Sequence, residues 1–453
     1  MKRPELLAPA GTLKSMRHAF AFGADAVYAG QPRYSLRARN NEFNHANLAQ
    51  GISEAHALGK QFFVAANIFP HNSKLKTFIR DMQVVIDMQP DALIMSDPGL
   101  IMMVREHWPE MPVHLSVQAN TVNYAAVKFW QSLGLTRVIL SRELSLDEIA
   151  QIRQECPDIE LEVFVHGALC IAYSGRCLLS GYFNRRDPNQ GTCTNACRWE
   201  YKTSAAAEAP EGKFVPQENI LPMEAFNAVQ ESGLSGCGDQ QRHPLADQVY
   251  FLEEAQRPGE MMPVFEDEHG TYIMNSKDLR AVEHVQRLTE IGVDCLKIEG
   301  RTKSHYYVAR TAQTYRQAIE DTLAGREFDP KLLGVLENLA NRGYTDGFYK
   351  RHHSHEYQNY IQGASQSHQQ QFVAEATHVD RKNGWVEVDV KNRFAVGDRL
   401  EFVLPGGNRE VTLERMETLK GEAVEVAPGS GHKMRIPLPE GVDGEMMLIS
   451  RFL

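Results

Sequence analysis

Short apolar runs alternate with helix-like segments from Glu5 to Ile298 in this 453-residue chain, and this alternation constrains the fold more than any other feature. Several runs have the same entrance, a small or turn-forming residue followed closely by a polar one, as in Gly23-Ala24-Asp25 and Gly292-Val293-Asp294. The runs are Glu5–Ala8, Ala26–Ala29, Phe62–Ala66, Ala92–Met95, Val113–Val117, Arg137–Leu140, Leu161–Val165 and Cys295–Ile298. Eight such units predict an α/β fold, a TIM-like (β/α)8 barrel within residues 1–350.

One step of the repeat is much longer than the others, the step from Leu161 to Cys295. It predicts an insertion after the seventh strand, at about residues 167–275. The loops that follow the strands of a parallel barrel line its catalytic face. We therefore expect the insertion to lie over the barrel mouth.

Four cysteines gather in this insertion with the spacing C-x6-C-x15-C-x3-C: Cys170, Cys177, Cys193 and Cys197. Convergent thiols can hold a metal centre. A 4Fe-4S cluster is the favoured interpretation, because its ligands tolerate irregular spacing. Zinc usually shows a short knuckle in both halves, and buried free thiols remain a further alternative. Disulfides fit least, because the chain has seven cysteines and no N-terminal apolar signal run.

Charge and composition limit the partners. The chain is 43% hydrophobic and 23% charged and has no apolar stretch long enough to span a membrane, so we expect a soluble protein of the reducing cytoplasm, without a membrane partner. The net charge of −10 argues against a generic nucleic-acid coat. A local basic patch in the insertion would still suit a polyanion, although an ordinary solvated loop explains it equally well. Its arginines are Arg176, Arg185, Arg186 and Arg198.

The chain changes texture after the predicted barrel. Helical stretches around Tyr306–Leu323 and Lys331–Asn341 lead into a His- and Gln-rich linker at residues 351–371. Residues 372–453 contain short apolar runs separated by turn residues, which predicts a small antiparallel β-barrel domain. These runs are Phe372–Thr377, Trp385–Val390, Arg399–Val403, Arg409–Leu413, Ala423–Val426, Met434–Pro437 and Glu445–Leu448.

Several ordered motifs resemble peptidase family U32, the collagenase-like peptidases. The segment Glu162–Ser180, EVFVHGALCIAYSGRCLLS, resembles the family signature. Further landmarks are Gly191–Trp199 (GTCTNACRW), Lys297–Arg301 (KIEGR), Glu5–Gly11 (ELLAPAG) and Gly23–Tyr28 (GADAVY). The resemblance covers the barrel with its insertion, and the β-rich tail is similar to the C-terminal domain of the longer members.

The resemblance implies a function different from the family label. The members that this chain resembles most are tRNA-modifying, iron-sulfur proteins that hydroxylate without molecular oxygen. It therefore implies 5-hydroxylation of the wobble uridine, with prephenate, a small carboxylate, as co-substrate, and an electron-donor protein as partner. In some relatives the fourth ligand lies farther downstream than Cys197, and Cys237 is the alternative here. We favour Cys197, because its i, i+4 partner Cys193 needs less ordering of the chain.

Polar residues that follow the predicted strands supply the candidate site. Arg142 and Arg301 suit a carboxylate, because a guanidinium fork binds it through two hydrogen bonds, although either could instead pair with Glu143 or Glu299. His166 would shuttle a proton near neutral pH. The remaining candidates are Glu299 as a catalytic residue and three amides that would bind an edge of the base, Asn67, Gln118 and Asn120. Each is also an ordinary type of loop residue.

Two other classes of function stay open. A non-catalytic iron-sulfur scaffold would bind RNA while a partner performs the chemistry. A peptidase would use His166 and Cys170 as base and nucleophile. Neither an HExxH zinc motif nor a GxSxG elbow occurs in the chain, which disfavours the peptidase.

Overall fold

A computed structural model describes most of the chain outside the cysteine-bearing insertion and the linker. The described residues are 1–36, 42–169, 201–208, 214–216, 250–254, 261–264, 266–267, 270–271, 277–341, 343–350, 370–442 and 446–453.

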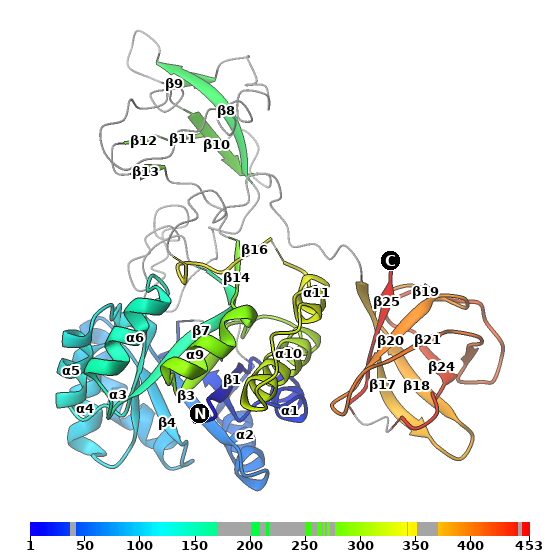
Figure 1. Cartoon of the computed structure of the whole chain (residues 1–453), viewed down its shortest axis with the longest axis horizontal. Helices are drawn as coiled ribbons and strands as arrows, with labels where there is room; N and C mark the ends of the chain where they lie inside the picture. Colours follow the sequence, from blue (N-terminus) through cyan, green and yellow to red (C-terminus); the bar gives the residue numbers. More distant parts are fainter. Residues whose placement is uncertain are drawn as a thin grey trace.

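Eight parallel strands form a closed barrel (Figure 1). Strand β15 closes it by pairing in parallel with both β1 and β7. The barrel strands are β1 (Glu5–Pro9), β2 (Ala26–Gly30), β3 (Gln61–Ala66), β4 (Ala92–Met95), β5 (Val113–Leu115), β6 (Arg137–Ile139), β7 (Glu160–Ala168) and β15 (Cys295–Ile298). The predicted (β/α)8 barrel is thus confirmed, and each predicted run overlaps a barrel strand.

Helices cover the outside of the barrel, and local capping explains where several of them begin. The side chains of Thr12, Asn44, Asp97 and Asn123 each accept a hydrogen bond from a backbone N–H of the first helical turn. The helices are α1 (Leu13–Ala21), α2 (His45–Ala57), α3 (Asn72–Ile86), α4 (Pro98–His107), α5 (Tyr124–Ser132), α6 (Leu146–Glu155), α9 (Val285–Ile291), α10 (His305–Leu323) and α11 (Lys331–Glu337).

The described parts of the insertion are β-strands. Strands β8 (Tyr201–Glu208), β9 (Phe214–Pro216), β10 (Tyr250–Glu254) and β11 (Met261–Val264) form a four-stranded antiparallel sheet. Strands β12 (Glu266–Asp267) and β13 (Gly270–Thr271) pair with each other. The chain then returns to the barrel through β14 (Asp278–Arg280), which pairs antiparallel with β7 and parallel with β16 (Tyr344–Thr345).

The C-terminal domain is an antiparallel β half-barrel. Among the described residues, its seven-stranded sheet has the order β21-β20-β25-β17-β18-β24-β22, and β19 and β23 form a separate pair. The strands are β17 (Gln370–Asp380), β18 (Trp385–Val390), β19 (Phe394–Ala395), β20 (Arg399–Val403), β21 (Arg409–Thr412), β22 (Glu417–Thr418), β23 (Val426–Ala427), β24 (Lys433–Pro437) and β25 (Leu448–Phe452).

The last strand lies later in the chain than the sequence predicts. The predicted run Glu445–Leu448 overlaps β25 only at Leu448. Strand β25 pairs with both β17 and β20, and its buried residues Leu448, Ile449 and Ser450 lie between these neighbours. Central pairing in the sheet therefore sets the position of the strand, whereas the apolar pattern alone places it too early.

The C-terminal domain packs against α1 and α10 of the barrel, beside which it lies in Figure 1. Arg310 of α10 donates two hydrogen bonds, of 3.0 and 3.3 Å, to the carboxylate of Glu401 in β20. Tyr306 stacks on Phe372, with ring centroids 4.6 Å apart. Both of these contacts are made by α10.

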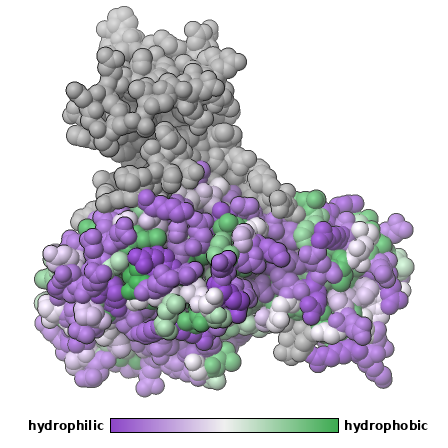
Figure 2. Space-filling view, viewed as in Figure 1, coloured by the Kyte–Doolittle hydropathy of each residue, from purple (hydrophilic) through white to green (hydrophobic). Residues whose placement is uncertain are grey.

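On the face drawn in Figure 2, hydrophobic residues are scattered among hydrophilic ones over the described parts of the barrel and the C-terminal domain. Within the described part of the chain, no helix combines the length and apolar character needed to cross a membrane.

Candidate active site at the barrel mouth

The carboxyl ends of the parallel strands bring several predicted residues together. Asn67, at the end of β3, donates a hydrogen bond from Nδ2 to Oγ of Ser116 after β5, at 3.3 Å. The carbonyl of Asn67 accepts a hydrogen bond from Oγ of Ser96 at 3.1 Å. Asn67 is thus held in place by the ends of two neighbouring strands, so its amide is positioned before any ligand binds.

Gln118 and Asn120 lie on a short 3-10 helix, η2 (Val117–Ala119), and on the residue after it. This helix begins two residues after the end of β5, so β5 is shorter than the predicted run. Asn120 ends the helix in a left-handed conformation with φ of 53°. Oδ1 of Asn120 accepts a hydrogen bond from Oγ of Ser141 at 2.9 Å. The hydroxyl of Ser141 also contacts Glu143. Asn120 and Glu143 are therefore linked through Ser141.

Arg142 lies between an aromatic face and a carboxylate. Its guanidinium carbon is 3.8 Å from the ring centroid of Phe164, and Nη2 lies 3.3 Å from Oε2 of Glu299. The Arg142 side chain is 9% exposed and that of Glu299 is 13% exposed. The pairing with Glu299 is the structural alternative expected from the sequence, and it also brings two predicted catalytic residues into contact.

Arg301 lies near a second aromatic ring. Its Nη1 donates a hydrogen bond to Oγ of Ser35 at 2.7 Å, and its guanidinium carbon lies 5.7 Å from the ring centroid of Tyr28. A Cβ atom at Gly30 would lie 2.7 Å from Nη1 of Arg301, so the glycine leaves room for the guanidinium. Arg142 and Arg301 therefore both lie on aromatic faces that form part of the barrel interior.

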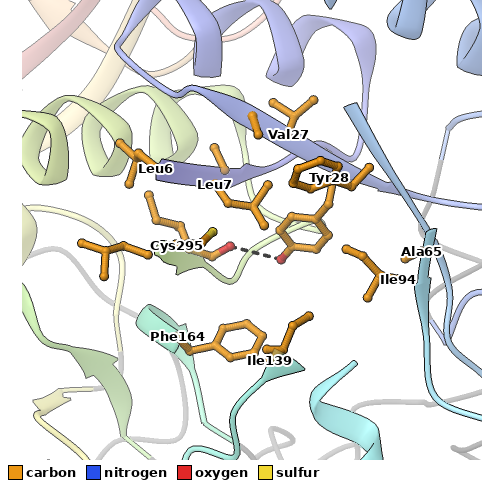
Figure 3. Close-up of a cluster of buried hydrophobic side chains, with 14 of the residues drawn as sticks. Leu6, Leu7, Val27, Tyr28, Ala65, Ile94, Ile139, Phe164 and Cys295 are labelled. Carbon is orange, nitrogen blue, oxygen red and sulfur yellow. Dashed lines mark hydrogen bonds between the residues drawn. The ribbon is translucent and has the colours of Figure 1, made fainter. Parts of the chain in front are cut away.

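Tyr28 and Phe164 form the floor beneath these arginines. Both are labelled in Figure 3, where the Tyr28 hydroxyl donates a hydrogen bond to the carbonyl of Ile298 at 3.1 Å. Nζ of Lys297 lies 4.4 Å from the Tyr28 ring centroid and 5.4 Å from that of Phe164. Each ring thus carries two cations, an arrangement that the attraction between cations and aromatic faces stabilises.

Buried ion pairs lie next to this floor. Nζ of Lys297 is 2.7 Å from Oε1 of Glu162, whose other oxygen lies 3.3 Å from Nη1 of Arg137. Arg137 in turn contacts Glu5 of β1 at 2.7 Å. The charges alternate from β1 through β6 and β7 to β15, which compensates the cost of burying them. This series of ion pairs therefore links β1 and β15, the two strands that pair where the barrel closes.

His166 is in a different place from the one predicted. A register shift between β7 and β15 occurs after the pair Lys297 and Phe164, so that His166 pairs with Ile298. Paired residues of parallel strands point to the same side, which directs His166 outward, toward α10. Its ring lies 5.4 to 5.8 Å from three tyrosine rings, those of Tyr307, Tyr315 and Tyr344.

The surroundings of His166 do not suit a proton shuttle. Nδ1 is 3.3 Å from the Tyr315 hydroxyl, whereas Nε2 is buried and has no hydrogen-bond partner among the described residues. Burial lowers the pKa of His166 to about 3, with the charges of Lys303 and Arg280 adding to the effect. The imidazole is therefore neutral at physiological pH, in contrast to the titration near neutrality that the sequence suggests.

The other predicted residues lie outside the described part of the chain. These are the cysteines Cys170, Cys177, Cys193, Cys197 and Cys237 and the arginines Arg176, Arg185, Arg186 and Arg198. The described segment 42–169 ends directly after β7, at the carboxyl edge of the barrel, and the cysteine segment follows it in the sequence. Of the cysteines that are described, Cys156 and Cys295 are buried, and burial raises the pKa of each thiol. Neither thiol is suited to form the thiolate that a metal needs.

Sequence reasoning missed the aromatic floor and the hydroxyls of Ser35 and Ser116. Tyr28 and Phe164 lie in apolar runs that predict only a strand. The useful signal would have been strand alternation, because residues two apart along a strand face the same side, as Phe164 and Glu162 do.

The arrangement can bind an anion beside a flat polar group. Two guanidiniums on aromatic faces suit a carboxylate or phosphate, because each planar fork offers paired donors. The amides and hydroxyls around them offer both donors and acceptors, as the edge of a nucleobase requires.

Comparison with known proteins places the chain in one family. A sequence model of peptidase family U32 matches residues 11–359, and one of the C-terminal domain of that family matches residues 368–449. The chain is 63% identical to tRNA hydroxylation protein P of Escherichia coli, over 100% of this chain and 97% of the relative. It is 60% identical to the protein of that name from Haemophilus influenzae, over 100% of this chain and 96% of the relative.

The U32 peptidase Mk0906, a solved structure, is 14% identical, with a TM-score of 0.34 over 43% of this chain and 81% of that chain. The strand pairings themselves carry the fold assignment. Because the family match spans most of the chain and relatives align along its whole length, this chain belongs to peptidase family U32.

Proposed function

We propose that this protein is a tRNA hydroxylase that converts the wobble uridine to 5-hydroxyuridine without molecular oxygen. The observation that carries the proposal is the full-length identity of 63% and 60% to proteins named tRNA hydroxylation protein P. The mouth supports it, because its amides and hydroxyls suit a base edge and its two guanidiniums suit an anion.

Prephenate is the proposed co-substrate and oxygen donor. A carboxylate would bind Arg142 and Arg301, which lie at the ends of β6 and β15. Among the described residues, the one hydrogen bond of the Arg142 guanidinium is to Glu299, so further N–H groups of the fork are available to a ligand. Glu299 would fix the orientation of Arg142 while the base binds nearby.

A 4Fe-4S cluster is the proposed cofactor, held by Cys170, Cys177, Cys193 and Cys197, with Cys237 as the alternative to Cys197. The spacing of the four thiols supports this choice over zinc. The burial of Cys156 and Cys295 supports it as well, because it leaves the insertion as the source of ligands. The cluster would supply electron transfer, and an electron-donor protein would be its partner.

A peptidase mechanism has less support. A general base works best with a pKa near the working pH, and burial holds the pKa of His166 at about 3. The described surroundings of His166 are tyrosines of α10 and β16.

Oxygen-free purification followed by iron and sulfide analysis tests the cofactor. Absorbance near 400 nm, at roughly the wavelength typical of sulfide-bridged iron, is the expected result. Colourless, iron-free protein would remove the cluster from the proposal. Replacing Cys197 and Cys237 separately by Ser identifies the fourth ligand, and loss of iron only in Cys237→Ser would overturn the choice of Cys197.

Incubation of the purified protein with unmodified tRNA and prephenate, followed by nucleoside mass spectrometry, tests the reaction. We expect 5-hydroxyuridine from the wild type and its loss in Arg301→Ala, with iron content unchanged. The control is Arg409→Ala, an exposed arginine of β21. Unaltered modification in Arg301→Ala would remove Arg301 from the site. If the wild type forms no product when a chemical reductant replaces the electron-donor protein, and forms it only when other proteins are added, the protein is a scaffold and not the catalyst.

A further inference from the structure

Helix α10 lies between the barrel mouth and the C-terminal domain and contacts both. On the barrel side, the Tyr315 hydroxyl donates to the carbonyl of Val165 in β7 at 2.6 Å. On the other side, Arg310 pairs with Glu401 of the C-terminal domain. One rigid element thus connects the β half-barrel to the strand ends that carry the candidate site.

Tyr307 of α10 contacts the turn after β15. Its hydroxyl donates a hydrogen bond to the carbonyl of Glu299 at 2.9 Å. Gly300 has a φ of 151°, and a Cβ atom there would lie 2.6 Å from Cε1 of Tyr307. The turn is therefore packed directly on the tyrosine ring, and the hydroxyl fixes the backbone of the residue that pairs with Arg142.

The C-terminal domain fixes α10 one turn farther along. Arg310 is 1% exposed and Glu401 is 8% exposed, so their ion pair is buried. Glu401 also accepts hydrogen bonds from Gln370 at 3.0 Å and from Asn408 at 2.7 Å. These bonds compensate the buried charges and lock the helix to the domain.

We propose that Tyr307 is a positioning residue, which holds Glu299 so that the Arg142–Glu299 pair is set for the reaction, and that the C-terminal domain fixes Tyr307 through α10. The effect on turnover rests on the proposed hydroxylase function, whereas the effect on the turn does not. The C-terminal domain then contributes to the geometry of the site.

Tyr307→Phe tests the first step, with Tyr344→Phe as the matched control. Tyr307 is buried and Tyr344 is partly buried, and both flank His166, but the Tyr344 hydroxyl donates to the carbonyl of Leu336, away from the turn. Hydrogen exchange of the peptide Glu299–Ser304 is measured in both variants. We expect faster exchange in Tyr307→Phe than in Tyr344→Phe, and equal exchange would overturn the proposal.

Turnover separates positioning from general loss of structure. In Tyr307→Phe we expect kcat to fall about tenfold and the KM for tRNA to stay within about twofold, because the pair orients the site and does not hold the tRNA. A kcat equal to that of Tyr344→Phe would overturn the positioning role. If the wild type makes no 5-hydroxyuridine while the turn still loosens in Tyr307→Phe, the proposed function fails and the structural link stands.

Glu401→Gln and the milder Asn408→Ala test the domain step in the full-length chain. We expect both to speed exchange in the peptide Glu299–Ser304, although Glu401 and Asn408 lie in the other domain. If exchange rises only within β17 and β20 while the turn is unchanged, the C-terminal domain does not fix Tyr307. Asn408→Ala decides the question should Glu401→Gln fail to fold.

Discussion

At the scale of single residues, we expect the paired donors and the planar face of the Arg142 guanidinium to contribute more to carboxylate binding than its charge does. Arg142→Lys keeps the charge but loses the stacking on Phe164 and the paired donors. We expect the KM for the carboxylate co-substrate to rise about tenfold, equivalent to about 1.4 kcal/mol of lost binding. Steady-state kinetics with varied co-substrate measure this, with Arg105→Lys on α4 as the control. An unchanged KM would show that Arg142 does not contact the carboxylate.

His166 makes stability depend on pH. Its pKa is 6.5 in an ordinary setting and about 3 in the folded protein, because burial disfavours the charged ring. As the pH falls below 6.5, the unfolded chain takes up a proton that the folded protein does not. The free energy of unfolding therefore falls by up to about 1.4 kcal/mol for each pH unit below 6.5. The fall stops near pH 3, where the ring is protonated in the folded protein as well.

Replacing His166 removes this dependence. We expect His166→Gln to lose less stability than the wild type between pH 7.5 and pH 5.5, when urea unfolding is compared at roughly these two values. Each protein at the higher pH serves as its own control, which cancels the cost of the substitution itself. Equal losses in both proteins would mean that the folded ring titrates normally.

At the scale of elements, Tyr315 fastens α10 to the barrel wall. Its hydroxyl donates to the carbonyl of Val165 at 2.6 Å and accepts from the N–H of Ala281 at 3.1 Å. Tyr315→Phe removes both bonds, whereas the N–H of Ala281 still donates to the carbonyl of Val165 at 2.9 Å, so we expect a loss of about 1–3 kcal/mol in the free energy of unfolding. Chemical denaturation measures it, and Tyr344→Phe, which loses one hydrogen bond, should cost less.

The barrel strands could be predicted from the sequence because each is largely buried and several have a recognisable entrance. Details that depend on pairing between strands could not. The register shift at His166 and the late start of β25 are set by neighbours distant in the chain. The 3-10 helix η2 begins directly after Ser116 and ends β5 early, for a local reason that an apolar pattern does not register.

The candidate site also contains residues that the sequence predicts and contacts that depend on packing between distant segments. Strand ends predicted Asn67, Asn120, Arg142, Glu299 and Arg301 at the mouth, because carboxyl ends of parallel strands must meet there. The aromatic floor depends on which side of a strand faces inward. The contact between Tyr307 and Glu299 depends on the crossing of a helix over a turn, which no local pattern specifies.

At the scale of the whole molecule, the buried pair of Arg310 and Glu401 joins the two domains, so we expect them to unfold as one cooperative unit. Glu401→Gln leaves the arginine charge buried without its counter-charge, so we expect a loss of about 3 kcal/mol. Calorimetry should show a single transition for the wild type and a separate, earlier one for the C-terminal domain of the variant. The control is Glu410→Gln, whose partner Arg399 is exposed. An equal effect of both variants would contradict the role of the buried pair.

The late position of β15 has a consequence for how the chain reaches its native state. Until Cys295–Ile298 has been synthesised, β1 and β7 each have one unpaired edge, and Glu162 has no ammonium beside it. A nascent chain with seven barrel strands therefore exposes two unpaired, aggregation-prone strand edges while the long insertion is still being synthesised. Ribosome-bound intermediates of this protein should need chaperone protection until the eighth strand emerges.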